Sequence, residues 1–76
     1  MPKLPAVTPK KLVKVFERLD FQIDHISGSH FVLYRDSDKK RVVIPLHTKD
    51  LPKGTLLAIL RQAGIGKNQL LDLLKD

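Results

Sequence analysis

The stretch FQIDHISGSHFVLYRDSDKKRVVIP, residues 21–45, decides the fold of this chain. Apolar and polar residues alternate along most of it with the period of half-buried strands. Two turn segments interrupt the alternation. In residues 27–29, Gly28 supplies a positive φ, and residues 36–39 are polar throughout. Three short strands joined by short turns predict an antiparallel meander, which Pro45 ends because proline donates no ladder hydrogen bond. The predicted strands are residues 21–25, 30–35 and 40–44.

An amphipathic helix is predicted before the meander. Thr8 and Pro9 open it, because threonine is a good N-cap and proline suits the first helical position, and Asp20 ends it. Its apolar stripe has the i, i+3, i+4, i+7 spacing of one buried face, and consists of Leu12, Val15, Phe16 and Leu19. The strand residues expected to pack against helices are Phe21, Ile23, Phe31, Leu33, Val42 and Ile44.

Two further helices are predicted after a loop over residues 46–52. The first begins near Lys53 or Gly54 and runs to Ala63, and Gly64 is predicted to end it in the left-handed conformation. A short last helix covers about residues 68–74. The element order is therefore α-β-β-β-α with an extra C-terminal helix, which is an α+β fold with a three-stranded antiparallel sheet.

Size and composition limit what the chain can be. Its 76 residues form a single domain, residues 1–76, in which residues 1–7, with two prolines and no periodicity, are expected to be a loose N-terminal leader. The absence of cysteine excludes disulfides and thiolate metal sites and is typical of a reducing compartment. The longest apolar run, Leu56 to Leu60, is far below the roughly 20 residues that cross a bilayer. We therefore expect a cytoplasmic protein.

The chain is strongly basic. It has 14 Lys and Arg residues against 8 Asp and Glu residues, a net charge of +6. This charge favours an anionic partner, and nucleic acid is the first candidate. An unbroken basic face lies opposite the apolar stripe of the first helix and consists of Lys10, Lys11, Lys14 and Arg18. This face suits a phosphate backbone, and it is at least as typical of a solvated helix surface. Lys49 and Lys53, near the start of the second helix, are further candidate RNA contacts.

His30 is the candidate for chemistry. The turn before it delivers it to the start of the second predicted strand, and alternation puts it on the outer face, beside Val32. An imidazole can take up or release a proton near neutral pH. RNA carries its own nucleophile, the 2′-OH, so a protein that moves protons and stabilises phosphate charge can cleave it, whereas DNA lacks that hydroxyl. The spacing of the residues alone supports a structural role for His30 about as well as a catalytic one.

No metal site or cofactor is predicted. His30 and His47 are 17 positions apart, with no carboxylate at a recognisable ligand spacing. Asp36 and Asp38 share one turn with basic residues close by, so we interpret them as turn formers.

Three motifs, taken together, resemble the HicA toxins: Gly28-Ser29-His30-Phe31, Pro45-Leu46-His47 and KGTLLAILRQAGI over residues 53–65. The resemblance runs from about Leu12 to Leu74, with the motifs in the family's order. It implies a double-stranded-RNA-binding-domain-like fold. It also implies the toxin of a type II toxin–antitoxin pair, a ribosome-independent mRNA interferase that arrests translation.

The same resemblance assigns roles to residues. It makes His30 the catalytic histidine, in a turn shaped by Gly28 and Ser29. His47 is carried over as a phosphate contact, a second proton donor or a structural residue. The implied partner is a HicB antitoxin that covers the His30 face and blocks mRNA. Asp20 departs from the family, which often has glycine there; because aspartate tolerates the left-handed conformation, we expect a slightly costlier turn and no loss of function.

Two other functions stay open at this point. The main alternative is a non-catalytic RNA-binding module on the same fold, in which His30 binds and Lys49 and Lys53 contact the phosphates. The other is a protein-interaction domain that uses the apolar band of residues 70–74, for which RNA affinity would depend only weakly on salt.

Overall fold

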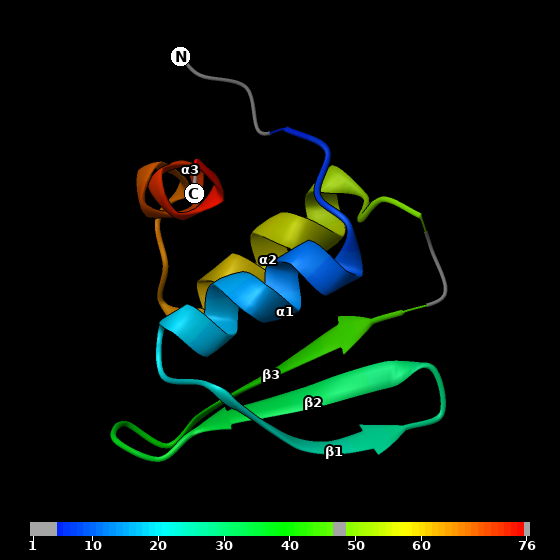
Figure 1. The fold of residues 1–76 in the computed structure, drawn as a ribbon, viewed down its shortest axis with the longest axis vertical. Coiled ribbons are helices and arrows are strands. Elements are labelled where there is room, and N and C mark those ends of the chain that lie inside the picture. Colours follow the sequence, from blue (N-terminus) through cyan, green and yellow to red (C-terminus); the bar gives the residue numbers. More distant parts are fainter. Residues whose placement is uncertain (1–4, 47–48, 76) are drawn as a thin grey trace.

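The computed structural model describes residues 5–46 and 49–75. Its elements, in chain order, are α1 (Pro9–Arg18), β1 (Gln22–Ser27), β2 (His30–Arg35), β3 (Lys40–Pro45), α2 (Lys53–Ala63) and α3 (Lys67–Leu74). The strands form one antiparallel sheet in the order β1-β2-β3. Figure 1 shows α1 and α2 over one face of the sheet, with α3 seen end-on beside them. The predicted α+β, double-stranded-RNA-binding-domain-like fold with its extra C-terminal helix is therefore confirmed.

The ends of α1 follow the chemistry of its flanking residues. The hydroxyl of Thr8 accepts a hydrogen bond from the backbone N–H of Lys11 at 3.2 Å, as an N-cap does. After the helix, Asp20 adopts a φ of 71°, the left-handed conformation expected of it. This turn leads the chain into β1 and packs the ring of Phe21 against Phe16, with 5.1 Å between their centroids.

The core lies between the covered face of the sheet and the helices. The strand residues Leu33, Val42 and Ile44 are fully buried, as the alternation predicts. They belong to one apolar cluster with the helix residues Leu12, Val13, Val15, Phe16, Leu56, Ile59, Leu60, Ala63 and Leu70. Val7 is fully buried in the same cluster, and its carbonyl accepts a hydrogen bond from the backbone N–H of Leu51 at 2.9 Å. The last residue of the expected loose leader is therefore fixed in the core.

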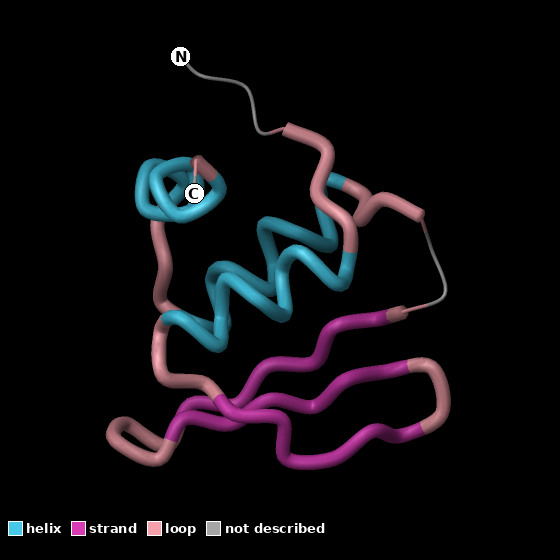
Figure 2. Tube along the Cα trace, in the orientation of Figure 1, coloured by secondary structure: helices cyan, strands magenta, loops and turns pink. Residues whose placement is uncertain are grey.

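β1 departs from simple alternation at a β-bulge. Ile23 pairs with Leu33, but the next residue of β2, Val32, pairs with His25, so Asp24 is an extra residue in β1. His25 therefore faces the open side of the sheet, whereas strict alternation would turn it toward the helices. Figure 2 shows the trace of β1 kinked early along its length. Ile23, expected in the core, is 41% exposed, because the helices pack mainly over β3, at the opposite edge of the sheet from β1.

The turn between β2 and β3 is held by its own charges. The guanidinium of Arg35 donates to both carboxylate oxygens of Asp38, at 3.0 and 2.8 Å, and this bonding lowers the pKa of the Asp38 carboxyl. Arg35 also donates to the carbonyl of Leu19 at 3.0 Å, which joins the hairpin to the end of α1. Asp36 accepts a hydrogen bond from Lys39 at 2.9 Å. Both carboxylates are thus turn partners, as their spacing indicated.

Candidate active site

A two-residue turn presents His30 at the start of β2. Gly28 has a φ of 58° and Ser29 has no positive φ, which is the pattern of a type II′ hairpin turn with glycine first. Ser27 and His30 form the cross-strand pair that the turn closes. The carbonyl of Ser29 accepts a hydrogen bond from the backbone N–H of Leu46 at 2.6 Å. The turn is therefore fastened to the end of β3, and two motifs that are distant in the sequence meet here.

His30 lies on the open face of the sheet, as alternation predicts. It is exposed, and it shares this face with Val32 and Tyr34, two and four positions further along β2. Val32 is only 7% exposed although no helix covers it, because His25 and Val43 flank it on the two neighbouring strands. The exposed imidazole therefore stands at the end of a closely packed sheet surface.

Two of the predicted basic residues lie at the same end of the sheet as His30. Lys10 and Lys49 line a pocket of about 340 Å³ together with Phe31 and Leu46. Phe31 follows His30 in β2 but points to the covered face. The pocket and His30 thus lie on the two sides of one end of the sheet, which we call the His30 end.

The other predicted basic residues lie elsewhere. Lys11, Lys14 and Arg18 border a groove between α1 and α3, and Arg18 Nη1 donates to the carbonyl of Leu73 at 3.2 Å. Lys53 is the first residue of α2 and is exposed. The basic face of α1 is therefore exposed along its length, but its two edges border different parts of the molecule.

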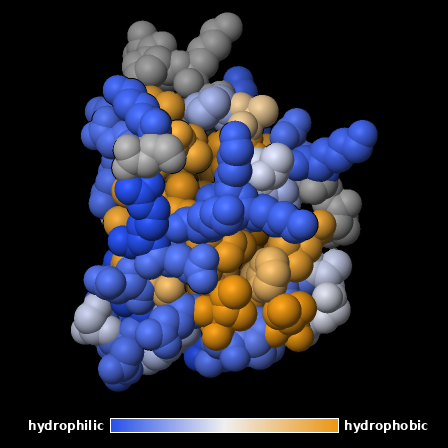
Figure 3. Space-filling model, in the orientation of Figure 1, coloured by the Kyte–Doolittle hydropathy of each residue, from blue (hydrophilic) through white to orange (hydrophobic). Residues whose placement is uncertain are grey.

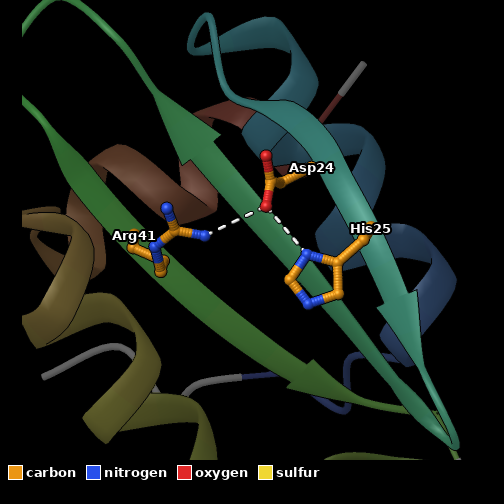
Figure 4. Close-up of polar contacts among 3 residues, drawn as sticks. All are labelled: Asp24, His25 and Arg41. Atoms are coloured by element: carbon orange, nitrogen blue, oxygen red, sulfur yellow. Dashed lines mark hydrogen bonds and ion pairs between the residues drawn. The ribbon is translucent and has the colours of Figure 1, made fainter.

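A polar cluster on the open face was not predicted from the sequence. Asp24 Oδ2 lies 2.7 Å from His25 Nδ1 and 3.1 Å from Arg41 Nη1, and Figure 4 shows the three side chains meeting over β2. The guanidinium of Arg41 also lies over the ring of Tyr34, 5.0 Å from its centroid. The hydrogen bond with His25, and then that from Arg41, lower the pKa of the Asp24 carboxyl. No sequence signal indicated this cluster, because it depends on the bulge.

The remaining predictions concern His47, metal ions and membranes. His47 lies outside the described residues, so its role stays a prediction. Within residues 5–46 and 49–75, no three His, Cys, Asp or Glu residues are grouped in a way that could hold a metal ion. In the same part of the chain, no helix is long and apolar enough to cross a membrane.

Comparison with known protein families gives the class of this protein. The family model described as the HicA toxin of bacterial toxin–antitoxin matches residues 9–65, from the start of α1 to just beyond α2. No curated protein matches the chain. Because the match covers well over half of the chain, the chain belongs to the HicA toxin family. It is therefore the toxin of a toxin–antitoxin system, and an antitoxin is its implied partner. The toxins of this family are generally of the nuclease type.

Proposed function

We propose that this toxin is an endoribonuclease that cleaves mRNA without a metal ion or the ribosome and so arrests translation. Membership of a family of nuclease-type toxins supports the proposal, and a net charge of +6 suits an RNA substrate. The observation that carries it is the position of His30. This exposed imidazole follows a turn that is hydrogen-bonded to the end of β3, so a rigid scaffold holds a proton-transfer group at the surface.

The proposed reaction uses the nucleophile that RNA itself carries. The imidazole of His30 takes the proton of a ribose 2′-OH, and the oxygen attacks the adjacent phosphorus. The bond from phosphorus to O5′ breaks and O5′ receives a proton, which leaves a 2′,3′-cyclic phosphate and a 5′-hydroxyl. Gly28 and Ser29 shape the turn that aims the imidazole. His47 is carried forward as a phosphate contact or a proton donor.

Basic side chains are proposed to hold the substrate by its phosphates. Lys10 and Lys49 border one pocket at the His30 end, so we assign them the phosphates next to the scissile one. Lys53 lies in the first turn of α2, which contains no acidic residue. We assign Lys53 to phosphates at the same end of the sheet. Phosphates further along the RNA are assigned to Lys11, Lys14 and Arg18.

The implied antitoxin is proposed to be of the HicB type and to cover the His30 face, where it would exclude RNA. On this face Val43 of β3 is 41% exposed, and at the same end of the sheet, on its other side, Ile26 of β1 is 60% exposed. Exposed large apolar side chains beside a functional surface suit a protein contact. Figure 3 shows apolar side chains gathered over the sheet on the side toward the β1–β2 turn, with hydrophilic ones around them. This surface supports the assignment of the partner's contact to the His30 end.

Cleavage of a long single-stranded RNA in the presence of EDTA tests the proposed activity. We expect the wild-type protein to cleave and His30→Ala to be slower by at least about 100-fold, since acid–base catalysis contributes about 10²–10⁴-fold. The products should carry 2′,3′-cyclic phosphate and 5′-hydroxyl ends. DNA of the same sequence is the substrate control and should stay intact. Equal unfolding free energies of the two proteins would show that His30→Ala has kept the fold.

The non-catalytic RNA-binding module predicts a different result. On that alternative, the wild-type protein binds RNA without cleaving it, and His30→Ala lowers the affinity only. Products with 3′-hydroxyl and 5′-phosphate ends would refute the 2′-OH chemistry while leaving a nuclease activity in place.

A further inference from the structure

A second histidine, His25, faces the same side of the sheet as His30. The bulge at Asp24 pairs His25 with Val32, which lies two positions after His30 in β2. Residues two apart in a strand share a face, so His25 and His30 are diagonal neighbours on the open face, with backbones roughly 7–8 Å apart. Two long side chains at this spacing on one face can both approach a single bound phosphodiester group.

Asp24 fixes which nitrogen of His25 is presented to a substrate. An ionised carboxylate only accepts hydrogen bonds, so the 2.7 Å contact with Asp24 Oδ2 requires the proton on His25 Nδ1. The second ring nitrogen, Nε2, is then the one that remains for a substrate. Figure 4 shows the imidazole extending over β2 with this nitrogen pointing away from Asp24. Arg41 contacts the same carboxylate oxygen and so restricts it from the other side.

We propose that His25 is the general acid of the cleavage reaction, an inference that rests on the proposed function. His30 takes the proton from the 2′-OH, the bond from O2′ to phosphorus forms, and the bond from phosphorus to O5′ breaks. Protonated His25 gives the proton on Nε2 to O5′ as it leaves, so one imidazole gains a proton while the other loses one. Exchange with water restores both, and no other co-reactant is needed.

The neighbours of His25 have supporting roles in this arrangement. Asp24 is a positioning residue: its carboxylate holds the ring in one tautomer and balances the positive charge of the protonated imidazole. Arg41, stacked over Tyr34, places a guanidinium on the same face, where it can attract the phosphate.

The test uses one RNA oligonucleotide in two forms, which differ at the linkage that the wild-type protein cleaves. One form has the natural O5′, which needs a proton to leave, and the other has sulfur there, which leaves as a thiolate without one. We expect His25→Gln to slow the oxygen form by about 100-fold and to leave the sulfur form within about threefold of wild type. His30→Gln should slow both forms, because both require removal of the 2′-OH proton.

Two further variants serve as matched comparisons. Asp24→Asn keeps the size of the side chain and removes its charge. It should therefore slow cleavage of the oxygen form by less than His25→Gln does, and it should cleave the sulfur form at close to the wild-type rate. His47→Gln changes the other candidate donor and should keep the wild-type ratio of the two rates. Circular dichroism and affinity for a 2′-O-methyl RNA, which has no free 2′-OH, check that each variant folds and binds.

Several results would overturn the inference. If His25→Gln slows the cleavage of both forms equally, His25 is a binding residue. If instead His47→Gln slows the oxygen form and cleaves the sulfur form at the wild-type rate, His47 is the proton donor. If His25→Gln cleaves the oxygen form like wild type while His30→Gln does not, His25 has no part in the chemistry and the proposed function stands. A wild-type protein that cleaves neither form would refute the proposed function and this inference with it.

Discussion

The covered and open faces of the sheet are built from the same three strands but contain different residues. On the covered face, Leu33, Val42 and Ile44 have no exposed surface. On the open face, Val43 is 41% exposed, and His30 is exposed as well. Because side chains alternate along a strand, one residue can hold the helices while the next faces a substrate. Stability and the proposed chemistry are thus separated by a single position in the chain, and a change on one face should leave the other intact.

The adjacent valines Val42 and Val43 give the most direct test of this separation and the largest expected effect on stability. Val42→Ala leaves a hole in the core and should lower the free energy of unfolding by about 2–3 kcal/mol, out of about 5–15 kcal/mol for a small domain. Val43→Ala makes the same change on the open face and should lower it by less than about 0.5 kcal/mol. Denaturant titration measures both. Equal losses would show that the two faces are equally packed in solution.

The two edges of the basic face of α1 can be compared by removing the charge of one lysine at each edge. Lys10→Gln should make the affinity for RNA less dependent on salt, by about 0.7 in the slope of log K against log salt, because one phosphate contact is lost. On an RNA of about four nucleotides, Lys14→Gln should leave the slope unchanged, since Lys14 borders the groove with α3. A longer RNA should reveal both contacts. An equal effect of the two variants on the short RNA would contradict the assignment of phosphates along the chain.

The smallest effect is expected at Asp20, which precedes β1 and lies on neither face. Its φ of 71° strains an L-residue, and glycine has no such penalty. Asp20→Gly should therefore raise the free energy of unfolding by about 0.5 kcal/mol, after the larger chain entropy of glycine is subtracted. Asp20→Ala is the control and should give no gain, because it removes the carboxylate but keeps the β-carbon. Thermal and denaturant unfolding would measure the difference, and cleavage activity should not change.

Features that depend on residues a few positions apart were predicted correctly. Thr8 caps α1, and Gly64 ends α2 with a φ of 74°, as a left-handed stop does. Alternation correctly put Leu33 in the core and His30 on the open face. In each case the conformation is set by the residue's own chemistry or by its close neighbours in the chain, so the information is present in the local sequence.

Features that depend on how distant segments pack were not predicted. The basic face of α1 was expected to act as one surface. In the structure the end of α3 borders a groove with Lys14 at one edge, and Lys49 lines a pocket with Lys10 at the other edge. Ile23 has the right period for the core and is nevertheless 41% exposed, because the helices pack over β3 and do not extend fully over β1. Neither result follows from the periodicity of a single element.

The sequence by itself determined where the chain turns, which residues of β2 and β3 share a face, and that the surface is positively charged. Only the tertiary structure decided that His25 shares the open face with His30. Ile23 and Ile26 are three positions apart, so strict alternation would place them on opposite faces. Their pairing with Leu33 and Phe31, which are two positions apart and face the core, requires one extra residue in β1. That residue is Asp24, and the reversal it causes brings His25 to the open face.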